Sequence, residues 1–404
     1  MNNYEYIVQA SSKDWAGDKD LCMNKVDGYP AIYWTIKRIF QENLHAKVTI
    51  AAPAFDEGGE LESILNEFVS ENVKLFYGYD ASPLDRMINV TNDLKDDNYI
   101  IRVDGMHYFF DVKKAIEMFD KAKKDSLDCY KYPDDFPVQF TSDVYKVGAL
   151  RKTSQLLNSE PESDSFKVHP KFYMFYRKDE FHCSYLKDLP RYNDDYYKNC
   201  REKASDVYEA ERTNVNEKTR IPAGDQLGFH YELITPYMEK DMRVLDIACG
   251  FGFGTRLLKT HVNEIVGCDL NENVINKLTK NLDKRLGLTY QCEDVTMMTF
   301  ENESFDSVVS METIEHVNEE KYLSEIFRVL KPGGLFILST PQNSKGSIPL
   351  HIGHVKEYSL DEIVNLVSKK FKIKRVIGIK AGTIIIPDDP VGTNTVIICH
   401  KGKV

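Results

Sequence analysis

The chain has 404 residues, which is too long for one ordinary domain and predicts two or three. Hydrophobic residues make up 42% and charged residues 28% of it, a composition that excludes a largely disordered protein. The formal net charge is −11. Because negative surfaces repel phosphate groups, we expect neither nucleic acid nor an anionic membrane as a main partner.

The eight cysteines form no CxxC pair, and several stand in apolar runs such as "EIVGCDL". They are typical of small core residues in a reducing compartment. No apolar run reaches the ~20 residues of a membrane span, and the N-terminal "MNNYEYIVQASSKDW" lacks the pattern of a secretory signal. We therefore expect a cytoplasmic protein without a membrane span, and a homodimer is left open.

Residues 1–155 alternate strand-like runs with segments whose apolar residues recur at helical spacing. The strand-like runs are "YEYIVQA", "KVTIAAP", "VKLFYGY" and "YIIRVDG". This alternation predicts a doubly wound α/β domain with a parallel sheet. Residues 156–205 are rich in Asn, Asp, Glu and Lys, which favours a linker with some helix, although the aromatic segment 171–186 should pack on a domain.

Residues 206–404 restart the alternation and predict a second doubly wound α/β domain. Its seven strand-like runs are "RVLDIAC", "EIVGCDL", "LTYQCED", "FDSVVSM", "GLFILST", "FKIKRVIGI" and "NTVIICH".

A glycine-rich turn follows the first of these runs, in "RVLDIACGFGFGTRLL" (243–258). Backbone N–H groups in such a turn can approach a ligand at the carboxyl edge of the sheet, although a purely structural turn is the alternative. Asp246, Asp269 and Asp294 stand at the ends of three successive runs and should converge on that edge. Asp269 follows Gly250 at the spacing of a carboxylate that binds ribose hydroxyls, which fits NAD or S-adenosylmethionine. The pattern GxGxG, with Thr255 where a dinucleotide fingerprint has glycine, favours the second.

Five ordered segments of residues 210–404 resemble the motifs of class I S-adenosylmethionine-dependent methyltransferases, which have a seven-stranded Rossmann-like fold. They are "VLDIACGFGFGTRLL", "VGCDLNENVI", "CEDVTMMTFENESFDSVVSMETIEHV", "RVLKPGGLFILSTPQN" and "HVKEYSLDEI". "ERTNVNEKTRIPAGDQLGFHYEL" resembles the entry segment of a subgroup from surface-polysaccharide gene sets, with matching Glu211, Arg212 and His230.

The resemblance implies a set of cofactor residues. Asp246 would help to hold the amino group of S-adenosylmethionine, directly or through water. Asp269 would accept from the ribose hydroxyls and Asp294 from the adenine amino group. The other implied contacts are Glu211, Arg212, Gly250, Gly252, Gly254, Leu270 and Val295.

An oxygen acceptor must lose its proton, and a base with a pKa near neutral speeds such a step by roughly two to four decades. The candidates are His316 in "ETIEHV" and His354 with Glu357 in "HIGHVKEY". The alternative is that His316 only packs beside the cofactor. His351 and His354 form an HxxH pair, but without further clustered ligands we predict no metal site.

Residues 4–155 resemble the cytidylyltransferase family of surface-polysaccharide biosynthesis, which implies a nucleotidyltransferase-like α/β domain that uses CTP with Mg²⁺. The segments that carry the resemblance include "QASSKDWAGDKDL", "FYGYDASPLDRM" and "IIRVDGMHYFFD". Lys19, Arg102, Asp104 and Asp143 would bind the nucleotide. Three positions depart from the family: Ser11 replaces an arginine, Met106 the metal-binding aspartate and Tyr145 a second acid.

These features predict a methyltransferase that modifies a hydroxyl of a sugar, sugar nucleotide or glycan terminus, joined to a cytidylyltransferase-like domain that activates or binds a related substrate. Main activity in CTP-dependent nucleotidyl transfer is one alternative. A nicotinamide-dependent oxidoreductase and a non-catalytic binding protein are the others.

Overall fold

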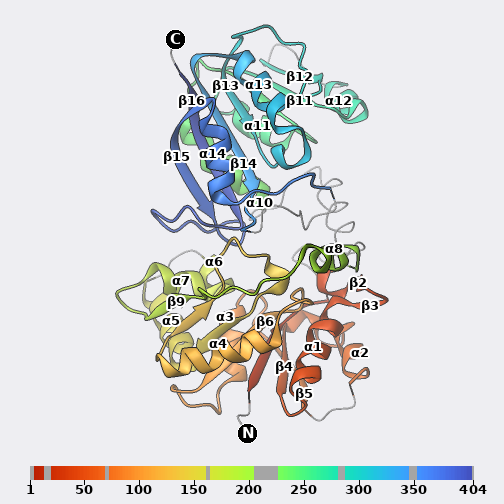
Figure 1. Ribbon diagram of the computed structural model, residues 1–404, viewed down its shortest axis with the longest axis vertical. Coiled ribbons are helices and arrows are strands. Elements are labelled where there is room, and N and C mark those ends of the chain that lie inside the picture. Colours follow the sequence, from red (N-terminus) through yellow and green to blue (C-terminus); the bar gives the residue numbers. More distant parts are fainter. Residues whose placement is uncertain are drawn as a thin grey trace. The chain divides into compact units, whose positions relative to one another are not determined.

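The computed structural model describes residues 4–12, 20–68, 72–160, 164–203, 226–280, 287–344 and 353–402. The chain divides into two compact units, Met1–Glu211 and Arg212–Val404 (Figure 1). Each unit contains its own seven-stranded sheet. Within the described ranges, no helix combines the length and the apolar character that crossing a membrane requires.

The sheet of the first unit has the order β5-β4-β1-β6-β8-β7-β9. The four predicted runs form its parallel part. Strand β8 is antiparallel to both of its neighbours, so the sheet is mixed rather than wholly parallel as predicted. Its strands are β1 (Glu5–Gln9), β4 (Lys47–Pro53), β5 (Val73–Gly78), β6 (Tyr99–Asp104), β7 (Cys129–Lys131), β8 (Asp143–Lys146) and β9 (Cys183–Tyr185), and β2 (Lys25–Val26) pairs with β3 (Tyr29–Pro30) in a separate hairpin.

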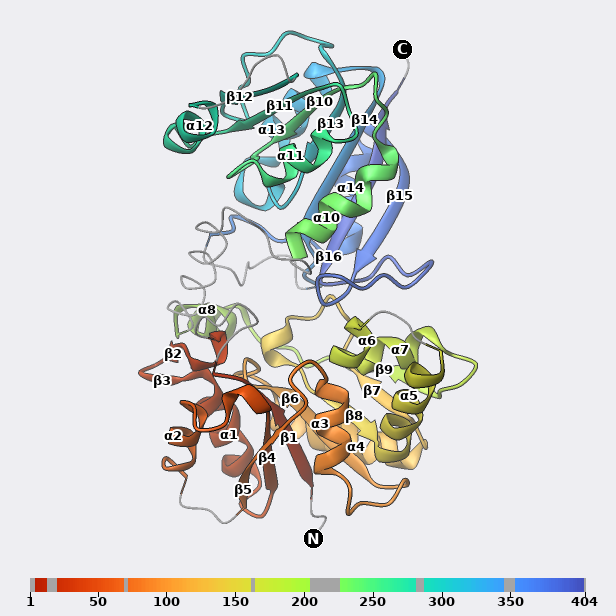
Figure 2. The same cartoon turned by 180° about the vertical axis from the view of Figure 1, so that it is seen from behind.

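Helices cover both faces of this sheet: α4 lies in front of it in Figure 1, and α3 lies in front of it in the reverse view of Figure 2. Helix α4 begins where the side chain of Asp111 accepts a hydrogen bond from the backbone N–H of Lys114. The helices are α1 (Ala31–Glu42), α2 (Leu61–Leu65), α3 (Pro83–Val90), α4 (Val112–Lys124), α5 (Val147–Ser159), α6 (Ser165–Val168), α7 (Pro170–Tyr176) and α8 (Asp194–Lys203).

The region predicted as a linker contributes to the first unit, which corrects the boundary expected near residue 155. Helix α5 runs across that position, and strand β9 pairs in parallel with β7 through Cys183 and Cys129. Helix α7 buries several large aromatic side chains. Their burial removes apolar surface from water, which explains why a segment of polar average composition is nonetheless packed.

The sheet of the second unit has the order β12-β11-β10-β13-β14-β16-β15. All seven predicted runs are strands, and β16 is antiparallel to both of its neighbours. The strands are β10 (Arg243–Ile247), β11 (Glu264–Asp269), β12 (Leu288–Cys292), β13 (Phe305–Ser310), β14 (Leu330–Pro341), β15 (Phe371–Ile379) and β16 (Asn394–Lys401). The helices are α10 (Gln226–Ile234), α11 (Phe253–Lys259), α12 (Glu272–Thr279), α13 (Glu319–Val329) and α14 (Leu360–Ser368).

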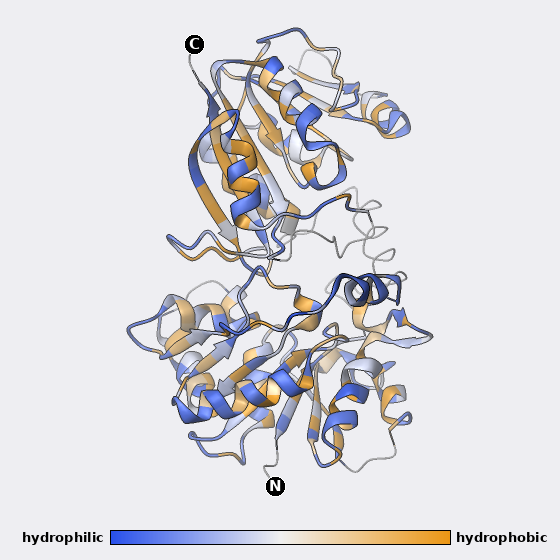
Figure 3. Ribbon diagram, viewed as in Figure 1, coloured by the Kyte–Doolittle hydropathy of each residue, from blue (hydrophilic) through white to orange (hydrophobic). Residues whose placement is uncertain are grey.

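Both faces of the second sheet are buried. Val244 and Leu245, adjacent in β10, belong to two different hydrophobic clusters, because successive side chains of a strand point to opposite faces. Figure 3 shows the central strands mainly in the hydrophobic colour, whereas α14 carries both colours. Because β10 to β13 are parallel, their carboxyl ends meet at one edge of the sheet, where open α/β folds bind ligands.

Candidate functional site

The loop after β10 turns into α11 through residues with left-handed backbone angles. Ala248 has a φ of 53°, Gly250 of 50° and Gly252 of 69°. A Cβ atom built on Gly250 would meet nothing within 4 Å. Gly250 therefore combines a conformation that favours glycine with open space, as a backbone that receives a ligand requires.

Packing explains the other two glycines. A Cβ atom on Gly252 would lie 2.5 Å from the hydroxyl of Tyr290, and one on Gly254 would lie 2.0 Å from the ring of Tyr231. The side chain of Tyr231 comes from α10 and so holds that helix against the start of α11. Of the three glycines that the resemblance assigns to the cofactor, Gly250 is the one whose missing side chain leaves space.

Asp246 lies beneath this loop, fully buried. Its Oδ1 accepts a hydrogen bond from Tyr231 Oη at 2.9 Å, and its Oδ2 accepts one from Thr255 Oγ1 at 2.6 Å. Burial raises its pKa to about 7, although the two hydrogen bonds favour the charged form. Each oxygen of Asp246 thus accepts one hydrogen bond within the protein, and the side chain positions the loop. Its contact with the amino group of the cofactor stays a prediction.

Asp269 ends β11 at the same edge. Its Oδ2 accepts a hydrogen bond from the backbone N–H of Gly250 and its Oδ1 one from that of Asn271, each at 2.9 Å. An ionised carboxylate offers about four lone-pair sites, so each oxygen can accept a further hydrogen bond. The backbone bonds fix the orientation of a group that retains the capacity to bind two hydroxyls.

Asp294 follows β12 and is exposed. Its Oδ1 accepts hydrogen bonds from the backbone N–H and the hydroxyl of Thr296, which lower its pKa. Leu270 and Met297, two residues of the same region, are 71% and 74% exposed. The side chain of Val295 instead packs in the core. Only its backbone groups can therefore make the contact with the cofactor that the resemblance implies.

Glu211 and Arg212, assigned to the cofactor by the resemblance, lie outside the described residues. His230 in α10 is buried, and its Nδ1 lies 3.4 Å from Glu312 Oε1 and 3.2 Å from Ser339 Oγ. Glu312 follows β13 with a φ of 49°, an unfavourable angle for a residue with a side chain.

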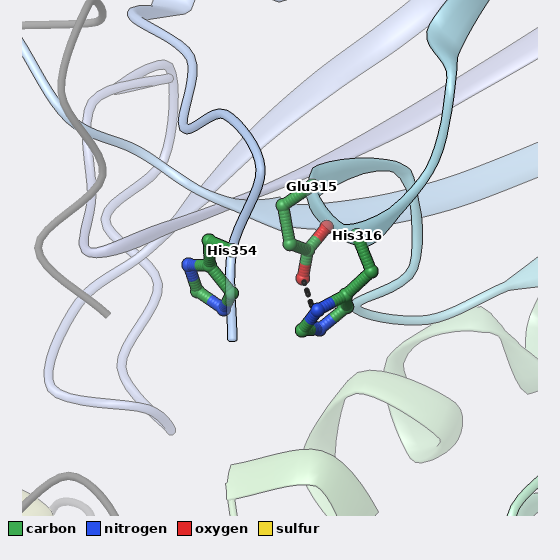
Figure 4. Close-up of side chains that lie close together, drawn as sticks. All are labelled: Glu315, His316 and His354. Atoms are coloured by element: carbon green, nitrogen blue, oxygen red, sulfur yellow. Dashed lines mark ion pairs between the residues drawn. The ribbon is translucent and has the colours of Figure 1, made fainter. Parts of the chain in front are cut away.

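The predicted residues His316 and His354 come together after β13 with Glu315 (Figure 4). The predicted Glu357 contacts His354. The Nδ1 atom of His354 lies 2.8 Å from Glu357 Oε1, and that of His316 lies 2.8 Å from the carbonyl oxygen of Gly353. The two imidazole rings meet edge to face at 4.8 Å between centroids. A segment after β14 is thus placed beside the short helix that follows β13.

Three carboxylates in this cluster influence one another. Glu315 is buried, and desolvation together with the charges of Glu312 and Glu357 raises its pKa well above the usual value. Burial alone would raise the pKa of Glu312 as well, but hydrogen bonding and charge from His230 lower it. The cluster therefore carries a negative potential that favours a proton or a cation.

Sequence reasoning missed Tyr231, Thr255, Glu312 and Glu315. Glu315 had an available signal, because it adjoins a candidate base in the motif "ETIEHV". Tyr231 and Thr255 had none, since their role depends on contact between two helices and a strand that are separate in the sequence.

The first unit brings three of its four predicted residues together, and the fourth, Lys19, lies outside the described residues. Arg102 lies 3.0 Å from Asp104 and 3.6 Å from Asp143. Lys171, from the segment predicted as a linker, lies 2.9 Å from Asp143. Desolvation would raise the pKa of both carboxyls. Arg102 lowers the pKa of Asp104, and Lys171 together with Arg102 lowers that of Asp143, so both lie below the usual value.

Comparison with known proteins places the second unit. Residues 245–338 match a family described as "Methyltransferase domain". A "Ubiquinone biosynthesis O-methyltransferase" of Coxiella burnetii is 32% identical over 130 residues, which cover 30% of this chain and 55% of that protein. A "Probable S-adenosylmethionine-dependent methyltransferase" of Mycolicibacterium smegmatis is 29% identical over 34% of this chain and 55% of the relative. The "24-methylenesterol C-methyltransferase 2" of Arabidopsis thaliana is 26% identical over 45% and 51%.

The chain thus spans about half the length of these curated relatives. The matched family begins in β10 and ends in β14, and so includes the glycine loop, the three aspartates and the segment with His316. The C-terminal unit of this protein contains a class I S-adenosylmethionine-dependent methyltransferase domain.

Proposed function

We propose that the second unit transfers a methyl group from S-adenosylmethionine to a hydroxyl of a sugar, sugar nucleotide or glycan terminus in surface-polysaccharide biosynthesis. One observation carries the proposal: a histidine and carboxylate cluster follows β13 at the sheet edge that also bears Gly250 and Asp269. A cofactor site and a group able to take a proton from an acceptor are therefore neighbours in one fold.

The described residues fit the cofactor. Gly250 leaves open space, the oriented carboxylate of Asp269 can accept from two ribose hydroxyls, and exposed Leu270 and Met297 offer apolar surface for an adenine ring. Asp294 can accept from an exocyclic amino group. When bound, S-adenosylmethionine supplies a methyl group activated on a sulfonium.

On the acceptor side, His354 and His316 are the proposed bases. Glu357 accepts from His354 Nδ1 and so favours the tautomer in which Nε2 carries the lone pair. The carbonyl of Gly353 has the same effect on His316. Either ring can then accept the proton of an acceptor hydroxyl, a contribution of roughly two to four decades in rate.

Calorimetry and mass spectrometry on the full chain test this proposal. We expect S-adenosylhomocysteine to bind and to raise the melting temperature, and NAD and NADP to do neither, because Thr255 stands where a dinucleotide loop has glycine. Incubation with S-adenosylmethionine and a panel of sugars, sugar nucleotides and phenols should add one methyl group to a sugar hydroxyl.

Two results would reject it. Stabilisation by NAD or NADP alone would indicate an oxidoreductase, and binding of S-adenosylhomocysteine without methylation of any compound in the panel would favour a binding protein. Phenols are in the panel because the Coxiella relative is named for ubiquinone biosynthesis. Methylation of a phenol but of no sugar would reject a sugar as the acceptor while leaving methyl transfer in place.

For the first unit, we propose binding of a nucleotide or sugar phosphate with little or no nucleotidyl transfer. Nucleotidyl transfer relies on a divalent cation held by carboxylates. Here Asp104 and Asp143 are already compensated by Arg102 and Lys171, so the residues present do not fit a magnesium site. Arg102 and Lys171 also offer N–H donors to a phosphate group.

Incubated with CTP, Mg²⁺ and acidic sugars or sugar phosphates, the protein should release pyrophosphate slowly or not at all. Loss of electrostatic stabilisation at one position typically costs roughly two to three decades in rate. Measured CTP affinity should be unchanged by a magnesium chelator. Rapid turnover that Asp104→Ala or Asp143→Ala abolishes would instead support CTP-dependent transfer as the main activity.

A further inference from the structure

A compact group of metal-ligating side chains lies beside the proposed acceptor position. One ligand atom from each of Glu315, His316 and His354 lies within 4.8 Å of the others. Figure 4 shows Glu315 and His316 on one turn and His354 on a separate segment beside them. Sequence spacing predicted no metal site, because no further ligand residues cluster with His351 and His354 in the sequence. The structure instead brings His354 next to the motif "ETIEHV", which is distant in the chain.

Each of the three side chains is oriented by a second group, as metal ligands usually are. His354 Nδ1 contacts Glu357 Oε1, and that carboxylate also accepts a hydrogen bond from Asn343 at 2.7 Å. His316 Nδ1 contacts the carbonyl of Gly353. Carbonyl and carboxylate oxygens only accept hydrogen bonds, so both rings favour protonation at Nδ1, which makes Nε2 the ligand atom.

The third side chain contains a buried polar atom that the fold does not satisfy. Glu315 Oε2 accepts a hydrogen bond from Thr340 at 3.0 Å, whereas Oε1 is buried without a hydrogen-bond partner among the described residues. The nearest ligand nitrogen, His316 Nε2, is 4.0 Å from it. A buried carboxylate oxygen without a donor is costly, and a cation would remove that cost.

The backbone holds the two segments together. The N–H groups of Val355 and Lys356 donate to the carbonyl oxygen of Glu315, at 2.8 and 3.2 Å. The cluster is thus fixed from both sides before any ion arrives, which lowers the entropic cost of binding one.

We propose that Glu315, His316 and His354 bind a divalent transition-metal ion through two imidazoles and one carboxylate. Imidazole ligands favour Zn²⁺ and other late first-row ions such as Co²⁺ over Mg²⁺, Ca²⁺ and Mn²⁺, which prefer oxygen ligands. Three protein ligands leave coordination positions open for oxygens of an acceptor, such as two adjacent hydroxyls, and a bound hydroxyl becomes more acidic. With the ion bound, Nε2 of both rings is a ligand and no longer a base, so the ion replaces the histidines in activating the hydroxyl, whose proton passes to water. This role rests on the proposed methyl transfer to a hydroxyl, whereas the binding of the ion does not.

The test measures binding of Zn²⁺ and Co²⁺ to the full chain by calorimetry, without cofactor or acceptor. The wild-type chain should bind about one equivalent at a site that Glu315→Gln or His354→Ala weakens by at least ~10- to 100-fold. His261 lies in the turn that follows α11, outside the cluster. His261→Ala is therefore the matched control and should leave the affinity for the ion unchanged. The Co²⁺ complex should lose its visible absorption bands in the His316→Ala/His354→Ala double variant.

Calorimetry of each variant with S-adenosylhomocysteine shows whether the fold and the cofactor site persist. Ion affinity no greater in the wild type than in the double variant would overturn the metal site while leaving the methyltransferase proposal intact. Ion binding with the expected variant effects, but no methylation in either the loaded or the chelated protein, would support the site and reject the proposed reaction.

Discussion

Replacing Asp269 with alanine is expected to weaken binding of S-adenosylhomocysteine by about 30- to 150-fold. The carboxylate is held by the backbone N–H groups of Gly250 and Asn271 and remains able to accept from two ribose hydroxyls. Charge-assisted hydrogen bonds of this kind contribute on the order of 2–3 kcal/mol together, and each 1.4 kcal/mol is a factor of ten. Titration calorimetry at fixed salt measures the change.

Glu264→Ala is the matched control, because it removes a carboxylate from the other end of the same strand. Its affinity should stay within about threefold of the wild type. The affinity of Asp269→Asn for S-adenosylhomocysteine should lie between those of Asp269→Ala and the wild type, because an amide retains one acceptor oxygen but lacks the charge. An unchanged affinity in Asp269→Ala, with the fold intact by circular dichroism, would contradict the placement of the ribose.

The second large effect concerns pH and Asp246. Its folded-state pKa of about 7 lies above the ordinary value of 3.8 because the side chain is buried. Its contribution to stability is therefore fully present below about pH 4 and is lost as the pH rises through 7. At 1.36 kcal/mol per unit, the loss is on the order of 4 kcal/mol.

Asp246→Asn should remove this dependence. At each pH, the free energy of opening the second unit is compared between the wild type and the variant. From about pH 5 to about pH 8, the value for the wild type should fall relative to that for the variant. Hydrogen exchange of peptides from β10 and β13 reports this unit, and comparison at equal pH cancels the intrinsic rates.

Asp306→Asn provides the control for the pH experiment. Burial would raise the pKa of Asp306, but Lys331 and the backbone N–H of Arg243 lower it. Its stabilisation is present above its ordinary pKa, so this variant should show a constant difference from the wild type in the same range. A constant difference for Asp246→Asn as well would mean that Asp246 is ionised in the folded protein throughout.

Local pattern determined the elements of the second unit. Each of its seven strands is five or more residues long and apolar enough to be recognised singly, and parallel strands place their carboxyl ends at one edge whatever packs around them. Asp269 and Asp294 were therefore predictable as neighbours. The glycine-rich turn after β10 was predictable too, because clustered glycines between a strand and a helix are visible in the sequence.

The first unit shows where local pattern was insufficient. Strands β7 and β9 have three residues each, too few to show a period. They exist because they pair with each other and because β7 also pairs with β8. Lys171 begins the aromatic segment 171–186, whose packing was expected, but its spacing from the strands did not show that α7 places the ammonium of Lys171 on Asp143. The spacing of residues in the sequence therefore could not show that Lys171 neutralises a carboxylate that a magnesium site would need.

The sequence by itself determined the two α/β units, the glycine loop and the acidic edge, because these depend on periodicity and on the direction of parallel strands. Only the tertiary structure decided that Asp246 is buried under Tyr231 and that Glu315, His316 and His354 share one cluster. The physical reason is the same in both cases. Each arrangement depends on contacts between segments distant in the chain, made by backbone hydrogen bonds and by packing, and no local pattern of residues encodes such contacts.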